Sequence, residues 1–222
     1  MSRKEDHTGR QAELFPVQPA DEGSAIFEQD LSSVPDAELV LTKAFLDHAG
    51  SAAYLQTLRE QVEWCAGEIT LYGKRHSVPR LQSWIGDPGC EYGYSGILLQ
   101  PAPFPPAMTE LRARLSEQTG IDFNCVLANL YRDGNDSVGW HADDEPELGP
   151  RPIVASLSLG ATRRFRMRHK VRSDLDPLSF DLEAGDLLLM QGATQDHWEH
   201  QLTKTKREVA ERINLTFRRI GL

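Results

Sequence analysis

The sequence of 222 residues has few cysteines and no long apolar run. Its three cysteines, Cys65, Cys90 and Cys125, are odd in number and widely spaced, which argues against a disulfide framework and against a paired-cysteine metal site. No apolar stretch approaches the roughly 20 residues that a membrane helix needs, so we expect no membrane association. The N-terminal segment also lacks the apolar stretch of a secretory signal. We therefore expect reduced thiols and a cytoplasmic location.

Positive charge is also scarce, with 24 Lys and Arg against 33 Asp and Glu and a net charge of -9. This balance argues against a simple basic nucleic-acid binder. The charge is uneven, however, because residues 161–172 contain no acid and six bases: Arg163, Arg164, Arg166, Arg168, Lys170 and Arg172. On a strand, alternate residues from Arg164 to Lys170 share one face. This basic strip could contact phosphate within an acidic protein.

The length suits one domain, and helical patterns are confined to its first half. Residues 1–24 are polar and without periodicity, which predicts a disordered tail before a single domain at 25–222. Apolar residues recur every three or four positions over 37–64, which predicts an amphipathic helix with some flanking structure, and a second helix is predicted over 107–118. Between them, 68–100 is rich in Gly, Pro and aromatic residues, which indicates turns and short strands.

The last hundred residues have the patterns of β-structure. Apolar residues alternate or run together over strand length at 123–131, 153–159, 164–170, 175–182, 186–191 and 213–219. Glycines separate these segments. Many short strands with close turn signals predict a sandwich or barrel with the helices packed outside it, and thus an α+β fold.

The sequence around His141 contains candidate metal ligands. On an extended chain His141 and Asp143, two residues apart, lie on one face and can reach one metal ion. The pair alone is weak evidence, but a distant histidine would complete a triad that leaves three positions open on Fe(II). His197 and His200 both qualify. Because they are three residues apart, a strand would direct only one of them into the site.

The C-terminal segment from Arg212 to Arg218 alternates strictly between polar and apolar residues. Its polar face would carry Arg212, Asn214, Thr216 and Arg218. An arginine fork pairs bidentately with carboxylates, so this face suits a dicarboxylic acid such as 2-oxoglutarate. The alternative is the solvated outer face of an edge strand.

Several motifs together resemble the AlkB family of nucleic-acid dioxygenases, and within it the branch that acts on duplex DNA. They are, in the family's order, NLYRDG, GWHADDE, SLSLGATRRFRMRHK, LEAGDLLLMQG, HWEHQL and RINLTFR, and the resemblance covers about 68–220. It implies a double-stranded β-helix (jelly-roll) core at about 121–220 and a nucleotide-recognition lid at about 68–100. It also implies Fe(II), with 2-oxoglutarate and O2 as co-substrates.

The resemblance also assigns the cofactor residues. Its metal ligands fall on His141, Asp143 and His200, which leaves out His197. Arg212 would hold the distal carboxylate of 2-oxoglutarate and Arg218 would lie nearer the metal. The remaining positions of that pocket would be Asn129, Tyr131, Asn214 and Thr216.

Substrate contacts are implied in the more variable loops. Tyr72 matches the wedge that fills the gap left by a flipped base, although the duplex-acting branch usually carries Phe there. Lys74 and Arg80 would contact phosphate. The base pocket would contain Tyr92, Tyr94 and Ser95, with Glu145 near the damaged base. For each tyrosine the alternative is a packing role.

The implied activity is the oxidative demethylation of N1-methyladenine and N3-methylcytosine in DNA repair, releasing formaldehyde, succinate and CO2. The partner would be alkylated DNA or RNA, and we expect a monomer. Two alternatives remain open. One is an oxygenase with the same cofactor that acts on RNA or protein, and the other is a noncatalytic jelly-roll module whose structural metal has four protein ligands.

Overall fold

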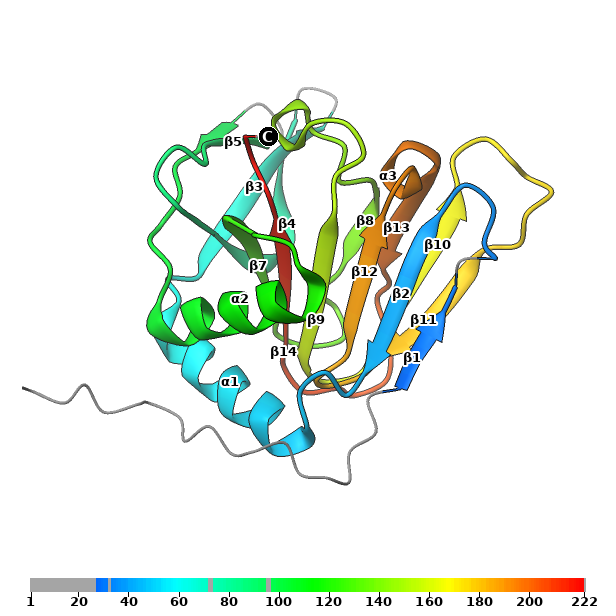
Figure 1. Cartoon of the computed structure of the whole chain (residues 1–222). Coiled ribbons are helices and arrows are strands. Elements are labelled where there is room, and N and C mark those ends of the chain that lie inside the picture. Colours follow the sequence, from blue (N-terminus) through cyan, green and yellow to red (C-terminus); the bar gives the residue numbers. More distant parts are fainter. Residues whose placement is uncertain (1–26, 32, 72–73, 95–96, 222) are drawn as a thin grey trace, which may run out of the picture.

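Two antiparallel sheets face each other in the computed structural model, which describes residues 27–31, 33–71, 74–94 and 97–221 (Figure 1). The predicted tail at 1–24 lies outside the described residues. The large sheet has the strand order β1 (Phe27–Asp30), β2 (Glu38–Lys43), β12 (Leu187–Gln191), β9 (Val154–Gly160), β14 (Arg212–Arg218), β7 (Cys125–Tyr131), β4 (Lys74–Gly86) and β3 (Cys65–Leu71). The small sheet has the order β11 (Leu178–Leu182), β10 (Arg163–His169), β13 (Trp198–Leu202) and β8 (Val138–His141).

Two long helices, α1 (His48–Gln61) and α2 (Pro106–Thr119), lie across the outer face of the large sheet (Figure 1). The side chain of Asp47 caps α1 by accepting from the backbone N–H of Gly50 at 2.6 Å. The other elements are short: a hairpin of β5 (Tyr92–Tyr94) and β6 (Ile97–Leu99), the 3-10 turn η1 (Pro146–Leu148) and the one-turn helix α3 (Thr194–His197). Among the described residues, no helix is both long and apolar enough to cross a membrane.

Strand β14 runs through the middle of the large sheet, between β9 and β7. Its apolar residues Ile213, Leu215 and Phe217 are fully buried in one cluster with Leu58 of α1 and Leu111 of α2. Its polar residues therefore face the small sheet, because successive side chains of a strand point to opposite faces. The larger apolar cluster lies on the helix side of the large sheet. A second apolar cluster, which includes Met190, Phe165 and Trp198, joins the two sheets, and the polar groups of β14 face a cavity beside it.

The α+β jelly-roll architecture with external helices confirms the predicted fold, but two local predictions were only partly right. The helix predicted over 37–64 is shorter, because Glu38–Lys43 forms β2 and pairs with β12. The segment 68–100 is not a run of short strands alone, because β4 has 13 residues and pairs with β7 from Leu81 to Gly86. In both cases pairing with a distant strand overrides the local pattern.

Gly185, in the turn before β12, provides a test of close backbone packing. It has a φ of 87°, and an added Cβ would collide with the backbone carbonyl oxygen of Leu46. Gly120, which ends α2, has a φ of 71° but open space around it. We expect Gly120→Ala to cost about 1 kcal/mol for the left-handed conformation. Gly185→Ala should cost about 1–3 kcal/mol more because the carbonyl must shift. Urea unfolding would measure both, and equal losses would contradict the clash.

Candidate active site

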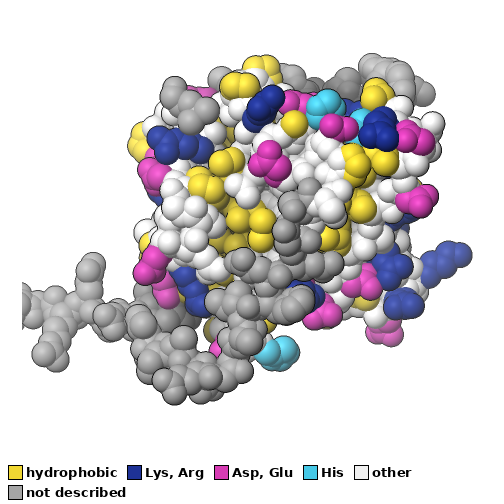
Figure 2. All heavy atoms as spheres, turned by 45° about the vertical axis from the view of Figure 1, so that its right-hand side comes forward, with side chains coloured by type: hydrophobic (Ala, Val, Ile, Leu, Met, Phe, Trp, Pro, Cys, Tyr) yellow, Lys and Arg dark blue, Asp and Glu magenta, His cyan; other side chains and the backbone are white. Residues whose placement is uncertain are grey.

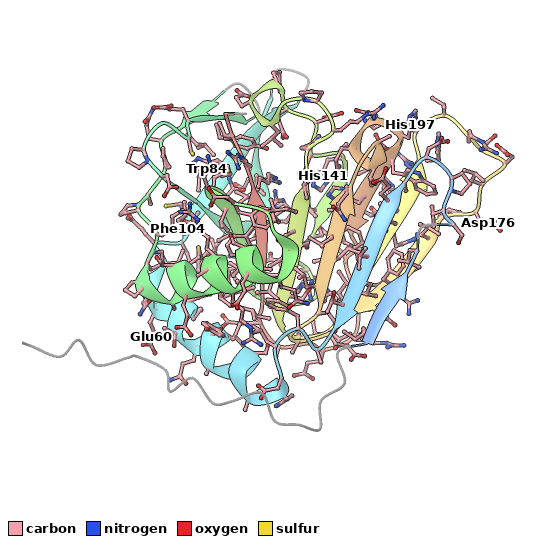
Figure 3. The ribbon with its side chains drawn as sticks, in the orientation of Figure 1. Glu60, Trp84, Phe104, His141, Asp176 and His197 are labelled. Atoms are coloured by element: carbon pink, nitrogen blue, oxygen red, sulfur yellow. The ribbon has the colours of Figure 1, made fainter. Side chains whose placement is uncertain are left out.

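Three potential metal ligands converge between the sheets. His141 ends β8, Asp143 lies in the bend that follows, and His200 lies in the middle of β13; one ligand atom of each lies within 4.8 Å of the others. His141 and His200 are directly opposite in the β8–β13 pair, with ring centroids 4.3 Å apart. His197 instead ends α3, and its ring stacks on His169 with centroids 5.7 Å apart. Figure 3 labels both histidines and shows His197 near α3, apart from His141.

The protonation states of this triad suit a divalent cation. Burial alone would raise the pKa of Asp143, but Arg218, His200 and His141 outweigh it and lower that pKa to about 2. Burial, with the nearby His141, lowers the pKa of His200 to about 3, so its imidazole is neutral at neutral pH. Nδ1 of His141 lies 2.9 Å from the carbonyl oxygen of Gly139 and must donate to it. In the neutral form of the ring, Nε2 would then carry the lone pair that binds a metal.

One carboxylate oxygen of Asp143 accepts a hydrogen bond from the protein, and the other is left to bind a metal. Oδ1 accepts from Nη2 of Arg218 at 2.6 Å, whereas the buried Oδ2 has no hydrogen-bond partner among the described residues. Nδ1 of the buried His200 also has none. Two imidazoles and one carboxylate fit Fe(II) with open positions. A structural zinc site would have four protein ligands, and the described part of the chain brings three together here.

A cavity of about 50 Å³ adjoins the triad, between the large and small sheets. All six residues predicted to bind 2-oxoglutarate line it: Asn129, Tyr131, Arg212, Asn214, Thr216 and Arg218. They come from β7 and β14, which are paired so that Asn214 lies opposite Asn129 and Arg212 opposite Tyr131. The register of these two strands thus brings the predicted residues to one cavity.

The guanidinium of Arg212 is fully buried but incompletely paired. Nη1 donates to the backbone oxygens of Ala161 and Leu182, and Nη2 donates to Oγ of Ser158 at 2.7 Å. Nε has no partner in the described structure. Burial lowers the pKa of Arg212 to about 10, so the group remains charged at neutral pH. A buried N–H without an acceptor is costly, and an anion placed against this edge would remove the cost.

Arg218 shows the same feature at the other end of β14. Its Nη2 atom is paired with Asp143, whereas the buried Nε and Nη1 have no partner among the described residues. Two buried guanidiniums with unpaired N–H groups therefore line one cavity, which fits a dicarboxylate better than a neutral ligand.

Arg80 was predicted to contact phosphate, but the structure places it in the cavity that adjoins the triad. It is only 5 % exposed and lines the same cavity. Its Nε atom donates to Oδ1 of Asn129 at 2.7 Å. Since Oδ1 is occupied, the amide N–H groups of Asn129 are the ones available to a ligand. The local sequence carries no signal of this contact, because Arg80 and Asn129 lie on different strands, β4 and β7, which are neighbours only in the folded large sheet.

Two of the predicted base-pocket residues also line the cavity, namely Tyr92 and Glu145. The Tyr92 ring stacks on Trp84 with centroids 4.4 Å apart and an interplanar angle of 15°. Burial raises the pKa of Glu145, although Arg218 and a hydrogen bond with Tyr92 act against this increase. The predicted residues Tyr72 and Ser95 lie outside the described residues, as do the side chains of Lys74 and Tyr94.

The basic strip has the predicted alternation, but acids on neighbouring elements pair with it. Arg164 and Arg168 are exposed, whereas Phe165 and Met167 are buried. Ion pairs join Arg164 to Asp181 of β11, Arg168 to Glu199 of β13, and Lys170 to Asp144. On the face shown in Figure 2, basic and acidic side chains are intermingled. The positive charge that the linear sequence indicated is therefore partly neutralised in the fold.

The metal assignment can be tested with the two competing histidines. We expect His200→Ala to abolish the binding of Fe(II), measured under anaerobic conditions with 2-oxoglutarate present, because it removes one of three ligands. His197→Ala is the matched control and should retain binding, since its ring packs on His169 outside the triad. Loss of iron in His197→Ala, with binding intact in His200→Ala, would reverse the assignment.

Replacement of Arg212 should weaken 2-oxoglutarate binding. Arg212→Lys keeps a cation but loses the planar edge, so we expect a loss of about 1.5–3 kcal/mol, or roughly 10- to 100-fold in affinity. Because Arg212 also donates to three protein oxygen atoms, we expect the melting temperature to fall as well. The exposed Arg164→Lys serves as control. Unchanged 2-oxoglutarate affinity in a folded Arg212→Lys variant would place the carboxylate elsewhere.

Comparisons with known proteins agree with this geometry. A family model described as the 2OG-Fe(II) oxygenase superfamily matches residues 38–218. The DNA oxidative demethylase ALKBH2 of Mus musculus is 44% identical over 172 residues, which cover 73% of this chain and 72% of the relative. The alpha-ketoglutarate-dependent dioxygenase alkB homolog 3 of Homo sapiens is 38% identical over 203 residues, which cover 88% and 70%.

Solved structures support the fold alone, because their sequences are distant. The structure of OsALKBH1 has a TM-score of 0.57 at 21% identity, over 82% of this chain and 97% of that chain. A 2OG-Fe(II) oxygenase from Burkholderia pseudomallei has a TM-score of 0.52 at 16% identity, over 82% and 86%. With the family match and the identities above, these findings show that the chain is an Fe(II)- and 2-oxoglutarate-dependent dioxygenase that belongs to the 2OG-Fe(II) oxygenase superfamily and, within it, to the AlkB family.

Proposed function

We propose that this enzyme repairs alkylated DNA by oxidative demethylation of bases such as N1-methyladenine and N3-methylcytosine. The observation that carries the proposal is that Glu145 and Tyr92 line the same cavity as the metal triad and the two arginines. An acceptor for a cationic base thus lies beside the groups that fit iron and a dicarboxylate. The names of the relatives, DNA oxidative demethylase among them, support the same reaction.

The residues of the site divide into three roles. His141, Asp143 and His200 would hold the iron, and Arg212 and Arg218 would hold the two carboxylates of 2-oxoglutarate. When bound, this centre supplies the oxidation of an N-methyl group by O2, with conversion of 2-oxoglutarate to succinate and CO2 and release of formaldehyde. The buried ring of Phe165, 5.3 Å from His200, would shield that ligand and Asp143 from bulk water, whereas His141 is half-buried.

Recognition of the damaged base would rest on its charge. Methylation at N1 of adenine or N3 of cytosine gives the ring a positive charge. Oε2 of Glu145 is buried without a hydrogen-bond partner among the described residues, so it can accept from such a base. A cation there would also favour the ionised form of Glu145, whose pKa burial raises. The ring of Tyr92 is already covered by Trp84, at 4.4 Å between centroids, and by the guanidinium of Arg218, 5.7 Å from its centroid, so the contact with the base would come from Glu145.

The direct test is loss of a methyl group from alkylated oligonucleotides. We expect mass spectrometry to detect demethylation of DNA that carries N1-methyladenine or N3-methylcytosine when Fe(II) and 2-oxoglutarate are both supplied. Omission of either component, or His200→Ala, should abolish it. Methylated RNA and methylated peptides, tested in parallel, separate the substrate classes. Turnover of peptides without turnover of either nucleic acid would reject the proposal.

Tyr72 should act as the wedge that stabilises a flipped base. Unstacking a base from a duplex costs a few kcal/mol, whereas a single strand demands much less. We therefore expect Tyr72→Ala to depress repair of duplex DNA far more than repair of single strands with the same lesion. The ratio of the two rates controls for general damage, because loss of folding or of iron would lower both. Equal losses would leave Tyr72 as a packing residue.

A further inference from the structure

Asp143 lies where the β-sheet no longer holds the chain. Strand β8 ends at His141, and its pairing with β13 runs through His141 opposite His200 and Val138 opposite Leu202. The ladder therefore fixes His141 and His200, but Asp143 lies two residues further on, in a bend. A ligand outside the ladder needs another restraint if its carboxylate is to stay beside the two imidazoles.

Gln195 of α3 supplies that restraint. Its Oε1 atom accepts from the backbone N–H of Asp143 at 2.9 Å. Because a backbone N–H can only donate, the amide oxygen rather than the amide nitrogen must face Asp143. The contact bridges 52 residues of sequence and is buried, so it joins α3 directly to the loop that carries the metal ligand.

A purely structural role does not explain this side chain. Gln195 is fully buried, and its Nε2 atom donates to the sulfur of Met190 at 3.6 Å, a weak acceptor. Burying a primary amide with one strong hydrogen bond is costly, whereas Leu or Met would fill a similar volume without that cost. The amide is better explained by its hydrogen bond to the backbone N–H of Asp143, which holds the metal-ligand loop in place.

A second contact reinforces the first at the next residue of the loop. Nζ of Lys170, just after β10, donates to the backbone oxygen of Gln195 at 2.8 Å and to Oδ2 of Asp144 at 2.9 Å. Two consecutive loop residues, Asp143 and Asp144, are thus tied to α3 and to the end of β10. Because these contacts hold the backbone, the Asp143 carboxylate can pair with Arg218 through one oxygen and face His141 and His200 with the other.

We propose that Gln195 is a positioning residue for the metal centre: it fixes the backbone of Asp143 so that Oδ2 faces His141 and His200. The inference rests on the iron site of the proposed function. It adds a buried amide that touches neither metal nor substrate but determines how well the third ligand is presented.

The test measures metal binding rather than turnover. Gln195→Met keeps the side-chain length and removes the acceptor, so the affinity of the metal-free protein for Co(II) alone, followed by its visible absorption, should fall roughly 10- to 100-fold. Gln195→Glu keeps an acceptor oxygen at the same place and should retain most of that affinity. If Gln195→Met binds Co(II) as tightly as the wild type, the proposal is wrong.

Thr194→Val is the matched control within the same helix. The buried Oγ1 of Thr194 accepts from the backbone of Glu38 and donates to that of Gln191, so its loss weakens the anchoring of α3 without touching Asp143. We expect a lower melting temperature with wild-type Co(II) affinity. Equal losses of affinity in Thr194→Val and Gln195→Met would show that α3 matters only as a structural element and would overturn the positioning role.

A measurement on the wild type covers the case in which Gln195→Met fails to fold. In the metal-free protein, the Asp143 amide should exchange its hydrogen slowly, although it lies outside the strand. Rapid exchange would reject the restraint. A folded wild type with a protected Asp143 amide but no Co(II) binding would instead reject the iron site, and with it the proposed function, while leaving the Gln195 contact itself established.

Discussion

Strand β14 is buried on both faces, and this double burial separates the apolar core from the polar cavity. Ile213, Leu215 and Phe217 fill the core beneath the helices, while Arg212 and Arg218 face the cavity. A shift of one residue would exchange the two sets and place both guanidiniums in the apolar core. Pairing on both sides, with β7 and β9, excludes that shift. The strand register therefore determines both the stability of the core and the location of the site.

The buried charged groups of the site leave several hydrogen-bonding atoms without a partner in the described part of the protein, and a ligand could pair with these atoms. Arg218 and Asp143 form a fully buried pair at 2.6 Å, and neither is saturated by it, because Nε and Nη1 of Arg218 and Oδ2 of Asp143 have no partner among the described residues. Such groups are costly in the absence of a ligand. A cation beside Oδ2 and a dicarboxylate beside the guanidiniums would remove these costs together. Ligands that bind the folded form in this way also stabilise it.

Local patterns predicted the parts of the molecule that depend on alternation and spacing. The two faces of β14 and the extent of α2 followed directly from the sequence. Features that depend on distant partners could not be predicted in this way. Strand β2 forms because it pairs with β12, and Arg80 of β4 donates to Asn129 of the neighbouring strand β7. The choice between His197 and His200 rested on a strand face and on family resemblance, but in the structure His197 belongs to α3. The role of Gln195 left no local signal, since its partner is 52 residues away.

The acids beside the basic strip bear on how an acidic enzyme with the proposed function would recognise DNA. Asp181 and Glu199 occupy the guanidiniums of Arg164 and Arg168, so phosphate must compete with carboxylates already in place. Together with a net charge of -9, this competition weakens the sequence-independent attraction on which nonspecific binding depends. Under the proposed function, discrimination would then fall to the cavity that Glu145 lines, where its carboxylate would favour a base with a positive charge and an undamaged base offers none. Weak attachment to the DNA backbone would thus increase the relative contribution of the lesion to the position at which the enzyme stays bound.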